Sequence, residues 1–141
     1  MPLDCHALRV LVVDDEPAVL RMVATMLEHA GFTVQTAHSG ADALALIREQ
    51  PEAVHLLLSD IMMPGLGGLE LASKAGEIAP LLPILFMSGF TGMAAPHGPL
   101  IAKPFKSAEL IAAIERVLSP SRRAPGRQGP SEAVPGAAQS A

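Results

Sequence analysis

Several features that stabilise or localise small proteins are missing or scarce in this chain of 141 residues. It has no tryptophan and no tyrosine, and phenylalanine occurs only four times. Half of the residues are hydrophobic, and because so few of them are aromatic, the core must be built mainly from aliphatic side chains. Cys5 is the single cysteine, which excludes an internal disulfide and argues against a cysteine-based metal site. Such cysteine use suits the reducing cytoplasm, where we expect the protein to be.

Long apolar runs and a basic leader are absent too. No stretch approaches the roughly 20 apolar residues that cross a bilayer, and Met1–Arg9 lacks the basic start and cleavage site of a signal peptide. We therefore expect a soluble protein with no membrane partner. The formal net charge is −4; three arginines and one glutamate give residues 119–141 a charge of +2, which leaves −6 for residues 1–118. An acidic body argues against direct nucleic-acid binding.

Short apolar segments alternate with longer amphipathic ones from residue 8 to residue 118. The apolar segments predict strands over 8–13, 32–37, 54–59, 82–87 and 100–102, and the amphipathic ones predict helices over about 17–30, 40–50, 68–78 and 105–118. Strict alternation of this kind predicts a parallel sheet with helices on both faces and right-handed crossovers. The predicted fold class is α/β, with a doubly wound five-stranded parallel sheet.

The composition changes after residue 118. Residues 119–141 are mostly Pro, Gly, Ser, Ala and Arg, without apolar periodicity. Such a segment cannot bury enough apolar surface to order itself. We predict one domain over residues 1–118 and a disordered tail over residues 119–141.

Polar side chains stand at the ends of the predicted strands. Asp14 and Asp15 end the first strand, Asp60 the third and Ser88 the fourth, and Lys103 follows the fifth. Ligands of open parallel sheets bind at the carboxyl ends of the strands, so we expect these side chains to converge. Three carboxylates repel one another unless a cation lies among them, and oxygen ligands alone suit Mg²⁺. An aspartate can accept a phosphoryl group when a metal and an ammonium offset the charge, so the set indicates metal-assisted phosphoryl transfer.

Each of these residues has a simpler interpretation when taken alone. Asp15 could cap the helix that follows, and Asp60 could be a loop carboxylate before a Pro-Gly turn. Ser88 could be a turn residue before Gly89, and Lys103 an ordinary exposed lysine. Their common placement at strand ends favours a single site.

Four segments of the sequence resemble those of a known family: VLVVDDEP (10–17), LLSDIMMPG (57–65), ILFMSG (84–89) and KPF (103–105). Over residues 8–118 the chain resembles the response regulator receiver domain of two-component signal transduction. The resemblance extends to free-standing receivers and to the receiver of a hybrid histidine kinase. It implies the flavodoxin-like receiver fold.

The resemblance also implies residue roles. Asp60 matches the phospho-accepting aspartate, Asp15 the direct Mg²⁺ ligand and Asp14 the acid that acts through a bound water. Met62 would offer its backbone carbonyl to the same ion. The implied phosphoryl donor is a phosphohistidine on a sensor histidine kinase or a histidine phosphotransfer protein.

Two further roles belong to the same resemblance. Ser88 matches the switch hydroxyl that binds the phosphoryl group, and Lys103 matches the family's lysine after strand five. In the family the peptide bond that corresponds to Lys103–Pro104 is typically cis. The downstream protein is not identified by the sequence.

The chain departs from the family's pattern at several positions. Leu100 stands where receivers place an aromatic switch residue, and Gly67 stands where an acidic helix cap is common. The 14 residues between Ser88 and Lys103 are too few for a strand, a helix and two connections, so we expect the fourth helix to be shortened or absent. Met62 and Phe90 are apolar where polar residues could orient a hydrolytic water, which predicts slow loss of the phosphoryl group.

The function predicted from these observations is a signalling switch that acts through protein contacts, without an output domain. It would not be an enzyme beyond its own phosphorylation and dephosphorylation. One alternative is a degenerate receiver that binds a partner without phosphorylation. Another is a small Mg²⁺-dependent phosphohydrolase, for which Glu16 stands two residues after Asp14 in the position of a general acid.

Overall fold

A computed structural model of the protein describes residues 8–89 and 99–118. The elements follow one another as β1 (Arg9–Val13), α1 (Pro17–His29), β2 (Thr33–Ala37), α2 (Gly40–Glu49), β3 (Leu56–Asp60), α3 (Gly68–Ile78), β4 (Ile84–Ser88), β5 (Leu100–Ala102) and α4 (Ser107–Leu118). All neighbouring strands are parallel, in the order β2-β1-β3-β4-β5. The predicted doubly wound, five-stranded α/β fold is thereby confirmed.

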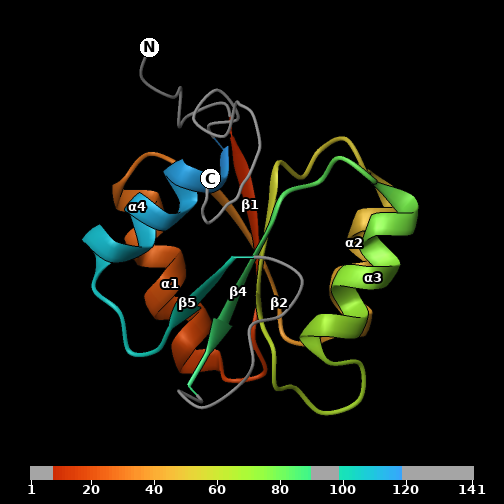
Figure 1. Cartoon of the computed structure of the whole chain (residues 1–141), viewed down its shortest axis with the longest axis horizontal. Coiled ribbons are helices and arrows are strands. Elements are labelled where there is room, and N and C mark those ends of the chain that lie inside the picture. The colour runs from red at the N-terminus through yellow and green to blue at the C-terminus, as the bar shows by residue number, and fades with distance from the viewer. Residues whose placement is uncertain (1–7, 90–98, 119–141) are drawn as a thin grey trace, which may run out of the picture.

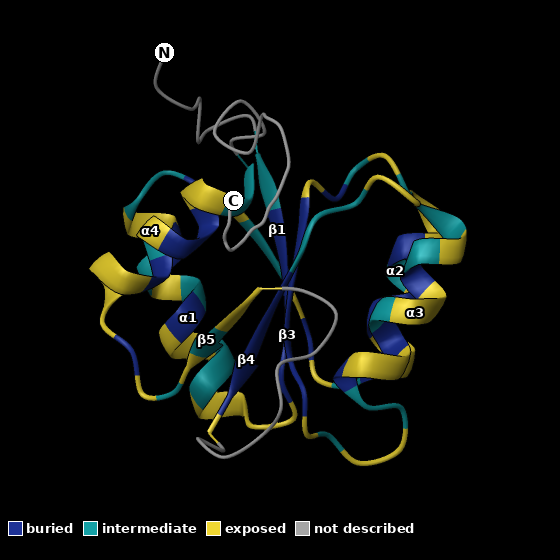
Figure 2. Ribbon diagram, viewed as in Figure 1, coloured by how far each residue is buried: buried dark blue, intermediate teal, exposed yellow. Residues whose placement is uncertain are grey.

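The helices cover the two faces of the sheet in pairs. Figure 1 shows α1 and α4 on one side of the strands and α2 and α3 on the other. Strand residues alternate between the faces: Val10 and Val12 pack with α1 and α4, whereas Leu11 and Val13 pack with α2 and α3. The central strands are therefore buried on both sides, as Figure 2 shows. This explains why they appear in the sequence as continuous apolar runs.

Local signals set several of the helix boundaries. The amide of Asp42 donates a hydrogen bond to the Ser39 hydroxyl at 3.1 Å, which confirms Ser39 as the cap of α2. Gly31, with a φ of 100°, follows α1 and turns the chain toward β2. Pro17 occupies the first turn of α1, where its missing amide hydrogen costs no helical hydrogen bond.

The structure corrects some of the predicted boundaries. The last helix begins at Ser107 and not at Phe105. Lys106 directly precedes it, and the Lys106 amide donates a hydrogen bond to Glu109 Oε1 in the first turn at 2.7 Å, which fixes the start of the helix. Strand β4 begins at Ile84, directly after Pro83, which has no amide to donate to the sheet. Asp60 and Ser88 are the last residues of their strands.

Two predictions fall outside the residues that the structure describes. The first is that the helix which receivers have between their fourth and fifth strands is shortened or absent, and it concerns residues 90–98. The second is the disordered tail over residues 119–141. Both stay predictions.

Within the described ranges, no helix is both long enough and apolar enough to span a bilayer.

The order of the strands determines where a ligand would bind. From β1 the chain moves outward to β2, and then returns to the other side of β1 to form β3. The carboxyl ends of β1 and β3 therefore flank the point at which the strand order reverses. Open α/β sheets bind their ligands outside these ends.

Candidate functional site

Three carboxylates meet at the carboxyl ends of β1 and β3. Asp14 and Asp15 directly follow β1, and Asp60 is the last residue of β3. One carboxylate oxygen from each of the three lies within 4.8 Å of the others. The convergence predicted from the ends of the strands is thus present in the structure.

The three carboxylates differ in exposure. Asp14 is fully buried and Asp60 is almost so, whereas Asp15 is exposed. Burial raises the pKa of the Asp60 carboxyl, and its hydrogen bond to Lys103 opposes this effect without cancelling it. The site therefore has two carboxylates set into the protein and one at its mouth.

Lys103 bridges the two buried carboxylates. Its Nζ atom lies 2.8 Å from Asp14 Oδ2 and 3.1 Å from Asp60 Oδ2, and its side chain is 20% exposed. Burial lowers the pKa of the Lys103 ammonium, but the hydrogen bonds to the two carboxylates outweigh burial, and the pKa is raised. Lys103 is therefore held as a cation inside the cluster. The interpretation of Lys103 as an ordinary exposed lysine is wrong.

Main-chain amides orient the buried carboxylates through the oxygen atoms that Lys103 does not contact. Glu16 N donates to Asp14 Oδ1 at 2.9 Å, and Met62 N donates to Asp60 Oδ1 at 3.3 Å. The N-cap of α1 is Glu16, which makes no side-chain capping bond. The interpretation of Asp15 as a helix cap is therefore wrong, and its carboxylate remains available at the site.

Met62 and Ser88 complete the predicted set. The Met62 side chain is half exposed, and its main chain adjoins Asp60 through the amide bond just described. Ser88 is buried at the end of β4, and its carbonyl oxygen accepts a 2.8 Å hydrogen bond from Lys103 N. The Lys103–Pro104 bond is cis, as predicted. The roles of Met62 as a metal ligand and of Ser88 as a phosphoryl ligand stay predictions.

The donor set fits a hard divalent cation. Three carboxylates share the cluster with a single ammonium, so negative charge remains that one lysine cannot balance. Among the residues that the structure describes, no cysteine or histidine joins the cluster, and oxygen ligands alone suit Mg²⁺ better than zinc or copper.

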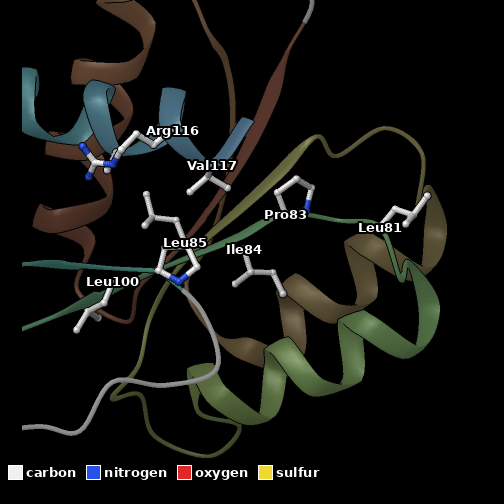
Figure 3. A pocket seen from close by; sticks show the side chains of 9 residues that line it. Leu81, Pro83, Ile84, Leu85, Leu100, Arg116 and Val117 are labelled. Atoms are coloured by element: carbon white, nitrogen blue, oxygen red, sulfur yellow. The ribbon is translucent and has the colours of Figure 1, made fainter. Parts of the chain in front are cut away.

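A cavity lies at the opposite edge of the sheet from the carboxylates, at the amino ends of β4 and β5. It has a volume of about 680 Å³ and is lined mainly by apolar side chains, among them Leu81, Ile84 and Leu85 (Figure 3). Leu100, which stands where the family has its aromatic switch residue, borders it. Among the described residues that line this cavity, none carries a carboxylate, hydroxyl or thiol, so the cavity offers no side chain that could accept a phosphoryl group.

Comparison with known proteins agrees with this geometry. The family of response regulator receiver domains matches residues 10–115. The response regulator receiver protein CpdR of Brucella abortus is 38% identical over 117 residues, covering 78% of this chain and 96% of that protein. The transcriptional regulatory protein TrcR of Mycobacterium tuberculosis is 34% identical over 122 residues, covering 82% of this chain, which spans only 47% of that protein.

Solved structures give the same answer. The receiver domain of the hybrid histidine kinase CckA aligns with a TM-score of 0.71 and 32% identity, covering 79% of this chain and 99% of that one. The family match extends over residues 10–115 and so includes Asp14, Asp60 and Lys103. The chain belongs to the response regulator receiver domain family.

Proposed function

We propose that the protein is a phosphorylation switch in which Asp60 accepts a phosphoryl group from a phosphohistidine. The observation that supports this most directly is the position of the Lys103 ammonium, 3.1 Å from Asp60 Oδ2, among three carboxylates. A carboxylate can approach an anionic phosphoryl group only if positive charge compensates both partners. The donor would be a sensor histidine kinase or a histidine phosphotransfer protein.

In the proposed reaction an oxygen of Asp60 attacks phosphorus. A phosphorus–oxygen bond forms, the phosphorus–nitrogen bond of the donor breaks, and the leaving imidazole nitrogen keeps the electron pair and takes up a proton from solvent.

Other residues would stabilise the transferred group. Lys103 Nζ can move its hydrogen bond from the Asp60 carboxylate to a phosphoryl oxygen, and the Ser88 hydroxyl can donate to another. Asp14, Asp15 and the Met62 carbonyl would hold Mg²⁺ together with Asp60. The bound ion would supply charge compensation for the phosphoryl oxygens.

The experiment that tests this proposal is phosphorylation by a small donor. The protein is incubated with acetyl phosphate or phosphoramidate, with Mg²⁺ or with EDTA, and its intact mass is measured. We expect one phosphoryl adduct that needs Mg²⁺, disappears in Asp60→Asn and persists in Asp42→Asn, which changes an exposed aspartate of α2. Absence of an adduct with every donor would favour a phosphorylation-independent binding module, and turnover of a phosphate ester would favour a hydrolase.

A further inference from the structure

The first residue of α3 lies directly against the main chain of the proposed phosphoryl acceptor. A Cβ atom placed on Gly68 would overlap the carbonyl oxygen of Asp60 and would lie 2.9 Å from its carbonyl carbon and from Ile61 Cα. All three of these atoms belong to the backbone, so no side-chain rotation could relieve the overlap. Helix α3 can therefore pack against the Asp60–Ile61 peptide only because residue 68 has no side chain.

Hydrogen bonds fix the same stretch of chain. The buried Ser59 hydroxyl donates to the Asp60 carbonyl oxygen at 2.9 Å. Gly68 N donates to Ile61 O at 2.9 Å, and Ile61 N donates to Met87 O on β4 at 3.0 Å. Both peptide planes between residues 60 and 62 are thus held, one by the Ser59 hydroxyl and one by the start of α3.

These contacts bear on the chemistry because the reacting groups extend from this main chain. The Asp60 carboxylate receives its amide hydrogen bond from Met62 N at 3.3 Å, two residues along the same chain. A rotation of the Asp60–Ile61 peptide would move that amide and the proposed metal-binding carbonyl of Met62 together. Displacements of about 1 Å in catalytic sites can cost about 100-fold in rate.

We propose that Gly68 and Ser59 are positioning residues for the phosphoryl acceptor, which hold the Asp60–Met62 main chain in the orientation needed for Mg²⁺ binding and phosphorylation. This inference rests on the proposed function of Asp60. Gly68 acts by permitting close packing and Ser59 by its hydrogen bond. Neither residue touches the phosphoryl group.

The test compares Gly68→Ala with two matched variants. Gly40→Ala also adds a methyl group to the first residue of a buried helix start, where its three nearest neighbours would all be atoms of Leu66, the carbonyl oxygen at 2.5 Å. Gly76→Ala adds a methyl group within α3 where nothing lies within 4 Å. Each protein is examined for Mg²⁺ affinity by calorimetry, for its rate of phosphorylation by acetyl phosphate, and for its stability in urea.

We expect Gly68→Ala to weaken Mg²⁺ binding and to slow phosphorylation, each by roughly 10-fold or more, at temperatures where the variant is fully folded. Gly40→Ala should lose stability but keep its Mg²⁺ affinity, and Gly76→Ala, inside helix α3, should keep its Mg²⁺ affinity without losing stability. Equal losses of Mg²⁺ affinity in Gly68→Ala and Gly40→Ala would overturn the proposal, since the effect would then follow stability alone.

Ser59→Ala keeps the inference testable if Gly68→Ala does not fold. This substitution removes a hydroxyl without adding bulk, and we expect it to lower Mg²⁺ affinity and phosphorylation rate several-fold. Unchanged values in Ser59→Ala would refute its positioning role. If the wild-type protein neither binds Mg²⁺ nor forms the adduct, the proposed function fails and this inference fails with it. If the wild type does both and the variants match it, only the positioning role is lost.

Discussion

Replacing Lys103 by methionine should expose how strongly the carboxylate cluster depends on its one ammonium. Methionine keeps most of the apolar stem and removes only the charge, which leaves Asp14 and Asp60 buried without a cation. Removing one partner of a buried ion pair costs about 3–5 kcal/mol. Because Asp60, whose pKa is already raised by burial, can relieve part of this cost by taking up a proton, we expect a loss of about 3 kcal/mol. That is a large share of the roughly 5–15 kcal/mol that stabilises a typical domain.

The loss can be measured by urea unfolding in metal-free buffer at neutral pH. The chain has no tryptophan or tyrosine, so far-UV circular dichroism is the suitable signal. With a slope of about 1–3 kcal/mol per molar urea, a loss of about 3 kcal/mol lowers the midpoint by roughly 1–3 M. Acidification should narrow the gap in stability between variant and wild type, because protonation of Asp60 removes an uncompensated negative charge. Mg²⁺ should stabilise the variant by binding the folded state only.

Lys106→Met is the matched control, since Lys106 is exposed and takes part in none of the ion pairs found among the described residues. Its free energy of unfolding should change by less than about 0.5 kcal/mol. The reasoning is refuted if Lys103→Met and Lys106→Met unfold at the same urea concentration at neutral pH. In that case the buried carboxylates would not need the ammonium.

Three further predictions concern single residues of the site. Burial raises the pKa of Asp60, so its ionised form destabilises the folded protein as pH rises. Metal-free Asp60→Asn should therefore have a higher melting temperature than the wild type at neutral pH and lose this difference in acid. An equal or lower melting temperature at neutral pH contradicts the argument. Asp15→Asn, at an exposed carboxylate, should weaken Mg²⁺ binding roughly 10- to 100-fold in calorimetry while changing metal-free stability by less than about 0.5 kcal/mol; unaltered affinity would exclude Asp15 as a ligand. Met62→Asn should speed decay of the acyl phosphate several-fold by orienting a water, and unchanged or slower decay counts against this role.

The sequence predicted the fold and the carboxylate cluster for the same physical reason. Strands buried on both faces appear as apolar runs, and each run stops where the chain reaches the polar edge of the sheet. Asp14 and Asp60 were therefore recognisable as strand-end residues before any coordinates were known. The parallel topology then required their side chains to face the same edge.

Contacts that depend on atomic distances could not be predicted in this way. The sequence predicts Gly68 only as the start of a helix, because its contact with the Asp60 carbonyl depends on how closely α3 packs against β3. Ser59 was counted as part of an apolar strand, although its hydroxyl donates to the next residue's carbonyl. A polar residue within an otherwise apolar run was the available signal. The simpler interpretation of Asp15 as a helix cap failed because the chain enters α1 one residue later.

Lys103 links parts of the sheet that are not neighbours. Its main chain is hydrogen-bonded to the end of β4 and continues from β5, while its side chain reaches Asp14, just after β1, and Asp60, at the end of β3. Strand β5 has three residues and only one partner strand, so it has the fewest backbone bonds to resist displacement. We therefore expect a change in charge at Asp60 to act, through the Lys103 side chain, on the shortest strand of the described sheet. A change in charge at Asp60, in the middle of the sheet, would in this way affect the edge strand β5.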